Sequence, residues 1–454
     1  MELQYILIGA FLGLAALFFG MPVGPVMLVL GVVGGLSLAG TAYFGNFGTA
    51  IWSTLGSETF TAIPLFILMG ELLLRTGFAD GMYRGFSVLL GWLPGGLLHT
   101  NIGTCTLFSA TSGSSVACAA TVGTVALPAL EKNNYNRRLS LGSLAAGGTL
   151  GILIPPSVNL LVYGGMMGTP IKSLFTAGII PGLTLALLFM IYLLIASMFL
   201  REKPKKAQFE GADQLADKMD ALLSLIPPLV IFGIIMGTIY TGIATPTESA
   251  SYAVITTIVF AVFKRLKGGG RALNFKILHE CLINSAKTTG MILFIIVCAN
   301  ILNSFIEYAG ITHSIAAWVK SLGLSFYQLV FGLVVLYAVL GMFLDALSVQ
   351  IATTPIIAPI VIAAGSDFVG ISSPEVMEYY SIWFGIFLIV MCELGMITPP
   401  MGLNLFIING IRKDTGTIKD TVIGALPFAG IMIFFVCFLI FFPQIAMFLT
   451  GLKI

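Results

Sequence analysis

The sequence contains very little charge. Asp, Glu, Lys and Arg make up 9% of its 454 residues, whereas soluble domains carry roughly 25%. Hydrophobic residues account for 57% of the chain, and the mean hydropathy is +1.02. This composition excludes an ordinary soluble domain, and a net charge of +2 gives no basic surface for nucleic acid. The composition therefore predicts a polytopic membrane protein that is surrounded by a lipid bilayer.

Reactive groups are also scarce. The chain has only three His and six Cys, the Cys form no CxxC pair, and no HExxH, GxSxG or phosphate-binding loop occurs. We therefore expect no enzyme activity, no disulfide framework, no structural metal site and no organic cofactor. The first apolar run, Leu3 to Gly20, lacks a basic flank and a small-residue cleavage site. It is predicted to be a retained span and not a signal peptide.

Apolar stretches of about 17–25 residues are long enough to cross a bilayer as one helix. By this measure the sequence predicts crossings near 4–20, 25–41, 59–76, 139–168, 176–200, 222–240, 245–263, 288–309, 380–410 and 421–449. Two amphipathic stretches, Phe78–Trp92 and Arg271–Lys287, suit helices that lie along the membrane interface. The predicted fold is an all-α polytopic membrane protein.

Two further apolar stretches, 97–130 and 325–364, are each divided by a tip of small or polar residues. The arms of the first stretch, at roughly 13 to 15 residues, are too short to cross a hydrocarbon core of about 30 Å. We predict that both stretches are re-entrant hairpins. The arms of the second are long enough to cross, so its assignment depends on its similarity to the first.

Two proline pairs interrupt predicted crossings, one within Gly151–Asn159 and the other within Gly395–Asn404. Each pair removes two backbone donors and opens the helix that precedes it. The stretches 139–168 and 380–410 are therefore predicted to be broken helices. Inside a bilayer, the freed carbonyls need protein, water or an ion as a partner. Two breaks in corresponding places are typical of a transporter's binding site.

The breaks belong to an internal repeat. Pro155–Pro156 matches Pro399–Pro400 at an offset of 244 residues. The first repeat is predicted over 1–200 and the second over 221–454, joined by a polar linker at 201–220. Each half contains five crossings and one hairpin. Because five is odd, the second half lies inverted relative to the first.

The placement of basic residues predicts the orientation. Connections that would share one side of the membrane hold 19 of the 22 Lys and Arg, and only Lys172, Lys320 and Lys453 fall on the other side. The basic side is expected to be cytoplasmic. Both termini are therefore predicted to lie outside the cytoplasm. Near a cytoplasmic end, Glu71 and Arg75 are spaced as a helical ion pair.

The tip of the first hairpin is rich in hydroxyls, among them Ser112 and Ser114, and faces the carbonyls freed in the first break. Neutral oxygens at this density suit Na⁺, a hard cation. The alternative is that these small residues only allow close packing. The second tip has Asp345, with Thr398 in the facing break. A carboxylate there indicates ion binding; the alternative is that Asp345 only caps the hairpin turn.

A half-helix is predicted to begin after each break, near Ser157 and near Met401. The N-terminal end of such a half-helix attracts an anion. Asn159 and Asn404 add amides there, which either bind the substrate or cap the new helix. Glu393, in the turn before the second break, is interpreted as a polar support for the break or as a titratable coupling group.

Taken together, the two Pro-Pro breaks with Asn, the two hairpins and the Ala244-Thr-Pro-Thr-Glu248 turn resemble the large membrane subunit of the tripartite ATP-independent periplasmic (TRAP) transporters, of the DctM or SiaM type. The resemblance covers the whole chain. It implies a bacterial inner-membrane protein with periplasmic termini, in which a transport domain moves like an elevator against a scaffold. It also implies two ion sites. The first carries over to Ser112, Ser114, Gly151, Ile154 and Pro156, and the second to Gly341, Asp345, Gly395, Thr398 and Met401.

The resemblance further implies that two or more Na⁺ are coupled to uptake of an organic acid. Sialic acid is the first candidate and a C4-dicarboxylate the next, and Ser157, Asn159 and Asn404 are the expected substrate contacts. The implied partners are an extracytoplasmic substrate-binding protein (DctP or SiaP type) and a small four-helix membrane subunit (DctQ or SiaQ type). Because the chain begins directly with the first large-subunit span, we expect that subunit to be a separate polypeptide. The alternative is a stand-alone divalent-anion/sodium symporter, which would be expected to carry Ser-Asn-Thr tips.

Overall fold

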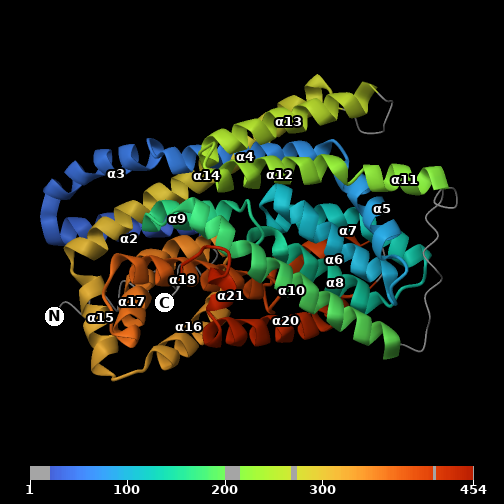
Figure 1. Ribbon diagram of the computed structural model, residues 1–454. Coiled ribbons are helices and arrows are strands. Elements are labelled where there is room, and N and C mark those ends of the chain that lie inside the picture. The colour runs from blue at the N-terminus through green and yellow to red at the C-terminus, as the bar shows by residue number, and fades with distance from the viewer. Residues whose placement is uncertain (1–20, 200–214, 267–272, 413–415, 453–454) are drawn as a thin grey trace.

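The computed structural model describes residues 21–199, 215–266, 273–412 and 416–452. The predicted crossing at 4–20 and most of the predicted linker lie outside these ranges. Within them, the chain forms helices and turns and contains no strand, so the predicted all-α fold is confirmed. Figure 1 shows the helices running mostly side by side along one direction.

The first half contains α2 (Val23–Ala39), η1 (Gly40–Phe44), α3 (Gly45–Leu55), α4 (Glu58–Arg75), α5 (Phe78–Leu90), α6 (Gly96–Ser112), α7 (Ser115–Lys132), α8 (Arg137–Thr149), η2 (Leu150–Ile152), α9 (Val158–Met167) and α10 (Ile171–Phe199). The second half contains α11 (Leu215–Leu223), α12 (Ile226–Thr241), α13 (Pro246–Leu266), α14 (Phe275–Tyr308), α15 (Ile311–Ser321), α16 (Phe326–Gly341), α17 (Ala346–Val369), α18 (Pro374–Met396), α19 (Leu403–Ile411), α20 (Ile418–Phe441) and α21 (Gln444–Met447).

The two halves repeat one order of elements: a helix, a short arm, a helical hairpin, a broken helix and a long helix. In the first half these are α4, α5, α6 with α7, α8 with α9, and α10. In the second half they are α14, α15, α16 with α17, α18 with α19, and α20. Both breaks contain a cis Pro-Pro bond. The helix pairs and the breaks occupy the segments in which the sequence predicts them.

Polar N-caps define where several of these helices begin. Ser114, Ser157 and Asp345 each accept a hydrogen bond from a backbone N–H in the first turn of α7, α9 and α17, respectively. Such caps satisfy N–H groups that have no partner inside the helix. All three caps lie at a hairpin tip or at a break, so the residues that shape the candidate site also start its helices.

Eight of the described helices are long and apolar enough to cross a membrane, and a ninth crossing results if α3 and α4, bent by 53°, form one span. The eight include α17, one of the arms that is long enough to cross. The stretch between the predicted crossings 25–41 and 59–76, for which the sequence made no prediction, is helical and forms η1 and α3. One prediction about local structure was wrong. The predicted interfacial helix 271–287 is instead continuous with the following crossing in α14, because no proline interrupts it.

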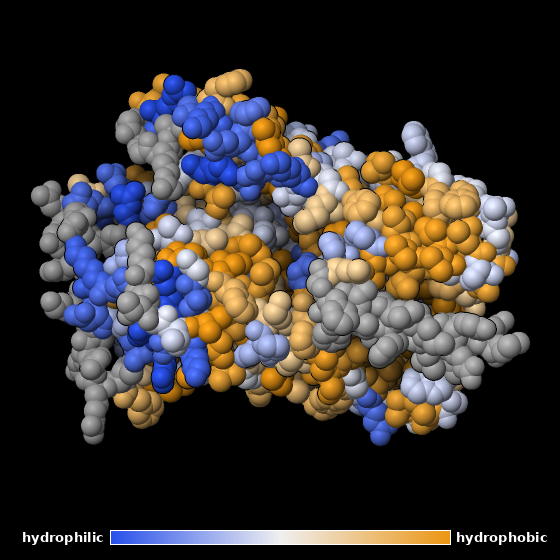
Figure 2. Space-filling view, turned by 180° about the vertical axis from the view of Figure 1, so that it is seen from behind, coloured by the Kyte–Doolittle hydropathy of each residue, from blue (hydrophilic) through white to orange (hydrophobic). Residues whose placement is uncertain are grey.

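The core is centred on α18, which packs against α16, α17, α10 and α20. Its large aromatic side chains Trp383, Phe384 and Phe387 are almost fully buried. The hydropathy of the outer surface differs from one end of the molecule to the other. Figure 2 shows apolar residues over most of one face and hydrophilic residues gathered at one end, as expected for a protein whose flanks contact lipid.

Candidate ion and substrate site

The first break lies between α8 and α9 and is entirely buried. The Ile154 N–H still donates to the Leu150 carbonyl at 3.2 Å, but the two prolines that follow have no N–H to donate. The Ser157 hydroxyl then donates to the Ile152 carbonyl at 2.5 Å and accepts the Leu160 N–H at 3.4 Å. Residues 151–160 are all buried. The Ser157 hydroxyl therefore bonds to a carbonyl of the break and also caps the N-terminus of α9.

The tip of the first hairpin packs directly on this break. At the tip, Gly113 adopts a φ of +61°, a conformation that favours glycine. A Cβ added to Gly113 would lie 2.9 Å from the Pro156 carbonyl oxygen, and one added to Gly151 would lie 2.6 Å from the Ser115 Cα. Only glycines allow so close an approach. The backbones of the tip and the break are thus in contact.

The hydroxyls at this tip have different partners. The Ser115 hydroxyl donates to the Thr149 carbonyl at 3.0 Å, and the Ser114 hydroxyl accepts the Ala117 N–H at 3.4 Å. The Ser112 hydroxyl is buried and has no hydrogen-bond partner within the described residues. Buried hydroxyls nearly always have a partner. Ser112, whose backbone also packs against Gly70 of α4, is therefore a candidate to provide an oxygen to a ligand near the tip.

The structure brings four of the five residues of the first predicted ion site to this junction: Ser112 and Ser114 on the tip, and Gly151 and Pro156 on the break. The Ile154 side chain points elsewhere. A Cβ added to Gly182 of α10 would lie 2.6 Å from its Cγ1. Only the backbone of Ile154 is therefore left to face the tip.

The second tip and break make a corresponding contact. A Cβ added to Gly395 would lie 2.5 Å from the Gly341 Cα. The Met401 N–H donates to the Met342 carbonyl at 3.2 Å, and the Thr398 hydroxyl donates to the Leu394 carbonyl at 2.6 Å. The tip of this hairpin is therefore bonded to the break through backbone groups. Met401 is 54% exposed, so this junction is more open than the first.

Asp345 lies on the second tip and is exposed. Its carboxylate accepts the Ser348 N–H at 3.1 Å and also the Ser348 hydroxyl. It is thus the N-cap of α17, which is the alternative that the sequence left open. A carboxylate oxygen has more than one lone pair, so capping still leaves capacity for a cation at this tip.

The two candidate amides connect the halves of the molecule. Asn159 donates from Nδ2 to Gln350 Oε1 at 3.0 Å, and Gln350 Nε2 donates to the Asn159 carbonyl at 2.7 Å. Asn404 donates from Nδ2 to the Ala145 carbonyl at 3.2 Å, and its Oδ1 is buried without a partner among the described residues. Asn159 is therefore engaged inside the protein, whereas Asn404 keeps a free acceptor.

Sequence reasoning missed Gln350. Its side chain is fully buried and joins α17 of the second hairpin to α9 of the first broken helix. A polar side chain within an otherwise apolar hairpin arm was the available signal. Its partner lies 191 residues away, and no local pattern indicates such a pairing.

Glu393 in α18 is fully buried, and neither carboxylate oxygen has a hydrogen-bond partner within the described part of the chain. The backbone of Leu153, in the first break, is the group that lies beside it. A buried carboxyl without a partner is costly. Glu393 precedes the second break in the chain and lies beside the first break in space. It therefore connects the two candidate regions.

Comparison with known proteins gives a consistent result. Residues 9–445 match the family described as "Tripartite ATP-independent periplasmic transporter, DctM component". The chain is 32% identical over 404 residues to the C4-dicarboxylate TRAP transporter large permease protein DctM of Pseudomonas aeruginosa, covering 88% of each protein. It is 29% identical over 457 residues to the sialic acid TRAP transporter permease protein SiaT of Haemophilus influenzae, covering 98% of this chain and 70% of SiaT.

Among solved structures, the fold is similar to that of the YdaH transporter of Alcanivorax borkumensis. The TM-score is 0.59 at 14% identity, and the match covers 89% of this chain and 87% of YdaH. This likeness concerns the fold alone.

Proposed function

Since the chain belongs to the DctM family of TRAP transporter components, we propose that it couples the uptake of an organic acid anion to Na⁺. We propose that the ions bind at two tip-and-break sites, each formed by a hairpin tip and the helix break that it contacts. The family makes it a multi-pass membrane permease. The coupling ion, the substrate and the movement are our proposal. The bacterial inner membrane, with both termini periplasmic, is the setting that we propose from the placement of the basic residues.

The observation that carries the proposal is the unpaired Ser112 hydroxyl at the first tip-and-break junction. Ser112 directly precedes Gly113, the tip residue that approaches the Pro156 carbonyl of the first break. Na⁺ is bound by such oxygens and needs no thiolate or imidazole. We expect the second junction to bind Na⁺ as well, with Asp345 as a charged member of the site. The coupled ions then number two or more.

The substrate is proposed to bind between the half-helices that follow the two breaks. The N-terminal ends of α9 and α19 carry partial positive charge and unpaired N–H groups, which favour an anion. Asn404 supports this placement, because its Oδ1 is free to accept a hydrogen bond from a substrate hydroxyl. Ser157 and Asn159, which have internal partners in this conformation, contribute only if those bonds open.

Sialic acid and a C4-dicarboxylate remain the two leading substrates. Relatives that carry these substrates in their names are 29% and 32% identical to the chain, a difference too small to rank them. Both are carboxylates, and each suits a site built from helix N-termini and amides. The substrate class is thus an organic acid anion.

The proposed partners are an extracytoplasmic substrate-binding protein, which delivers the anion, and a small membrane subunit. SiaT extends beyond the region that this chain matches, so the separate nature of the small subunit is tested by whether it co-purifies as its own chain. The proposed mechanism is an elevator, in which the hairpins and broken helices move against the scaffold. The stand-alone symporter gains no support from the relatives.

The test is uptake into proteoliposomes that contain this chain, a small TRAP subunit and a candidate binding protein. Labelled sialic acid and labelled succinate are offered separately, and Na⁺ is varied independently inside and outside. We expect uptake of one of them to require an inward Na⁺ gradient and the binding protein. Uptake that is equal without Na⁺, or without the binding protein, would contradict the proposal.

A further inference from the structure

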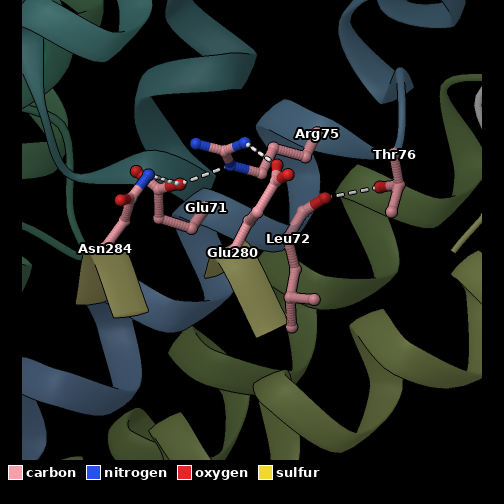
Figure 3. Close-up of polar contacts among 6 residues, drawn as sticks. All are labelled: Glu71, Leu72, Arg75, Thr76, Glu280 and Asn284. Atoms are coloured by element: carbon pink, nitrogen blue, oxygen red, sulfur yellow. Dashed lines mark hydrogen bonds and ion pairs between the residues drawn. The ribbon is translucent and has the colours of Figure 1, made fainter. Parts of the chain in front are cut away.

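The C-terminal end of α4 is tied to α14 by an ion pair network. Arg75 contacts Glu71 Oε2 through Nε at 2.9 Å and Glu280 Oε2 through Nη1 at 2.7 Å. Asn284 donates to the same Glu71 oxygen at 3.5 Å. Figure 3 shows the side chains of α4 and α14 converging on Arg75. The network includes the helical pair that the sequence predicts and extends it to a second helix.

Lys264 of α13 contacts the chain directly after Arg75, where α4 ends. Its Nζ donates to the carbonyls of Thr76 at 2.8 Å and Gly77 at 2.7 Å, and it lies 5.0 Å from the centre of the Phe78 ring. Carbonyls at a helix C-terminus lack partners within the helix and carry partial negative charge. An ammonium group that meets two carbonyls and an aromatic face has a defined position.

The residues that Lys264 contacts lie on both sides of a joint. At Gly77 the chain adopts a φ of +70°, which ends α4 and starts α5. Beyond it, α5 packs against α6 and α7 of the first hairpin. Tyr83 of α5 donates to Asn101 Oδ1 of α6 at 3.1 Å, and a Cβ added to Gly103 would lie 2.9 Å from the Phe86 ring. The arm α5 therefore packs on the first hairpin and also on α11, where a Cβ added to Gly85 would lie 2.8 Å from the Ala221 carbonyl oxygen. The helix α4 packs most extensively against α13 and α14.

The corresponding joint in the second half is not held in this way. There the chain turns at Gly310, with a φ of +64°, between α14 and the arm α15. The only hydrogen bond that a side chain donates to the Gly310 carbonyl, among the described residues, comes from Ser314 of α15 itself. In α15, Ile311 is the one buried residue. Within the part of the chain that the structure describes, the first joint is bonded to a helix distant in the sequence and the second is not.

We propose that Lys264 is a latch on the joint at Gly77: it holds α5 and the first hairpin in the conformation described here, and it releases them when they move. Arg75, which precedes the joint, anchors α4 to α14 in every conformation. The latch rests on the proposed function, because it presupposes that the first hairpin moves against α13 and α14. Lys264 is thereby a positioning residue and contacts neither ion nor substrate.

The test uses distances between spin labels in the full chain reconstituted in nanodiscs. Labels on Glu131→Cys, at the end of the first hairpin, and on Lys287→Cys of α14 report their separation, with the half-buried Cys437 replaced by Ser. Lys264→Met removes the latch. We expect the ratio of the described conformation to all others to fall about tenfold, as for loss of a hydrogen bond to a charged group.

Arg265→Met is the matched control, because Arg265 also donates to a backbone carbonyl, that of Leu273 at 3.1 Å, but does not contact α5. Its distances should equal those of the wild type. Phe78→Leu removes only the ring under the ammonium and keeps an apolar side chain, so it should shift the populations the same way by a smaller factor. It supplies the test if Lys264→Met does not fold.

Superimposable distance distributions for wild type, Lys264→Met and Phe78→Leu would overturn the latch. So would an equal shift in Arg265→Met, since it would show a general loosening of this end of α13. Na⁺-driven uptake by the wild type is measured in parallel. Its absence would count against the proposed function, whereas intact uptake with unshifted distances would count against the latch alone.

Discussion

The two tip-and-break sites have the same plan and opposite surroundings. At the first, the break is buried over 151–160 and its tip offers neutral hydroxyls. At the second, Asp345 and Met401 are exposed. The two copies of the repeat thus form one closed junction and one open junction in a single conformation.

This difference indicates that the two sites have different roles. A cation in the first site would be bound mainly by neutral oxygens, and in such buried surroundings the loss of one oxygen has a large effect. A cation in the second would meet a full negative charge, but solvent weakens that attraction. We therefore expect the first site to be the more sensitive to the loss of a single atom. The following predictions test this asymmetry.

The largest effect is expected from separating the first tip from its break. Gly151→Ala places a methyl group against the Ser115 backbone, and overpacking of this kind costs roughly 1–3 kcal/mol. Na⁺-dependent uptake should be nearly abolished. Gly395→Ala, whose added Cβ would lie 2.5 Å from the Gly341 Cα, should disturb the second junction as strongly and also reduce uptake. Gly290→Ala in α14, where nothing lies near the added Cβ, is the control. Normal Na⁺-dependent uptake by Gly151→Ala would contradict a role for the first junction.

Ser112→Ala removes the unpaired hydroxyl and little else. If that oxygen binds Na⁺, its loss costs roughly 1.5–3 kcal/mol, which raises the half-saturating Na⁺ concentration about tenfold to hundredfold. Uptake should recover at high Na⁺. Ser114→Ala should also weaken Na⁺ binding, and it removes the N-cap of α7 as well. Ser140→Ala removes another buried, unpaired hydroxyl of α8 and should leave the Na⁺ dependence unchanged; a similar shift there would remove the argument for Ser112.

Gln350→Leu breaks the amide pair that joins the second hairpin to the first broken helix. It leaves the Asn159 side chain buried and unsatisfied, which costs roughly 1–3 kcal/mol. The thermal unfolding temperature of the detergent-purified protein should fall. Gln328→Leu, in the exposed capping box of α16, should have a smaller effect. An unchanged unfolding temperature for Gln350→Leu would show that the pair contributes nothing to the packing of the two halves.

Asp345→Asn should have the smallest effect, because the site is exposed and an amide oxygen still caps α17. We expect a severalfold rise in half-saturating Na⁺ and a lower Hill coefficient for Na⁺ in uptake, since one coupled ion is lost. If Asp345 is only a cap, the curve should match that of the wild type.

The sequence was sufficient for the helices, the hairpins and the breaks, because length, proline pairs and polar tips are local signals. It also placed Gly151 and Gly395 at junctions, since the repeat aligns them, and Ser112 at the first tip, since that tip is rich in hydroxyls. It was insufficient for the Asn159–Gln350 pair and for Lys264 at Gly77. Each of these joins residues about 190 positions apart, and only the packing of the helices brings them together. The exposure of Asp345 likewise depends on neighbours that no local pattern specifies.

The most direct test of the central claim is equilibrium binding of radioactive Na⁺ to the purified protein without substrate, for the wild type, Ser112→Ala and Asp345→Asn. The account predicts that the wild type binds more than one Na⁺ per chain. Ser112→Ala should weaken one class of site strongly, and Asp345→Asn should weaken another class slightly. Three superimposable binding curves, or no saturable Na⁺ binding by the wild type, would contradict the assignment of the tip-and-break junctions as ion sites.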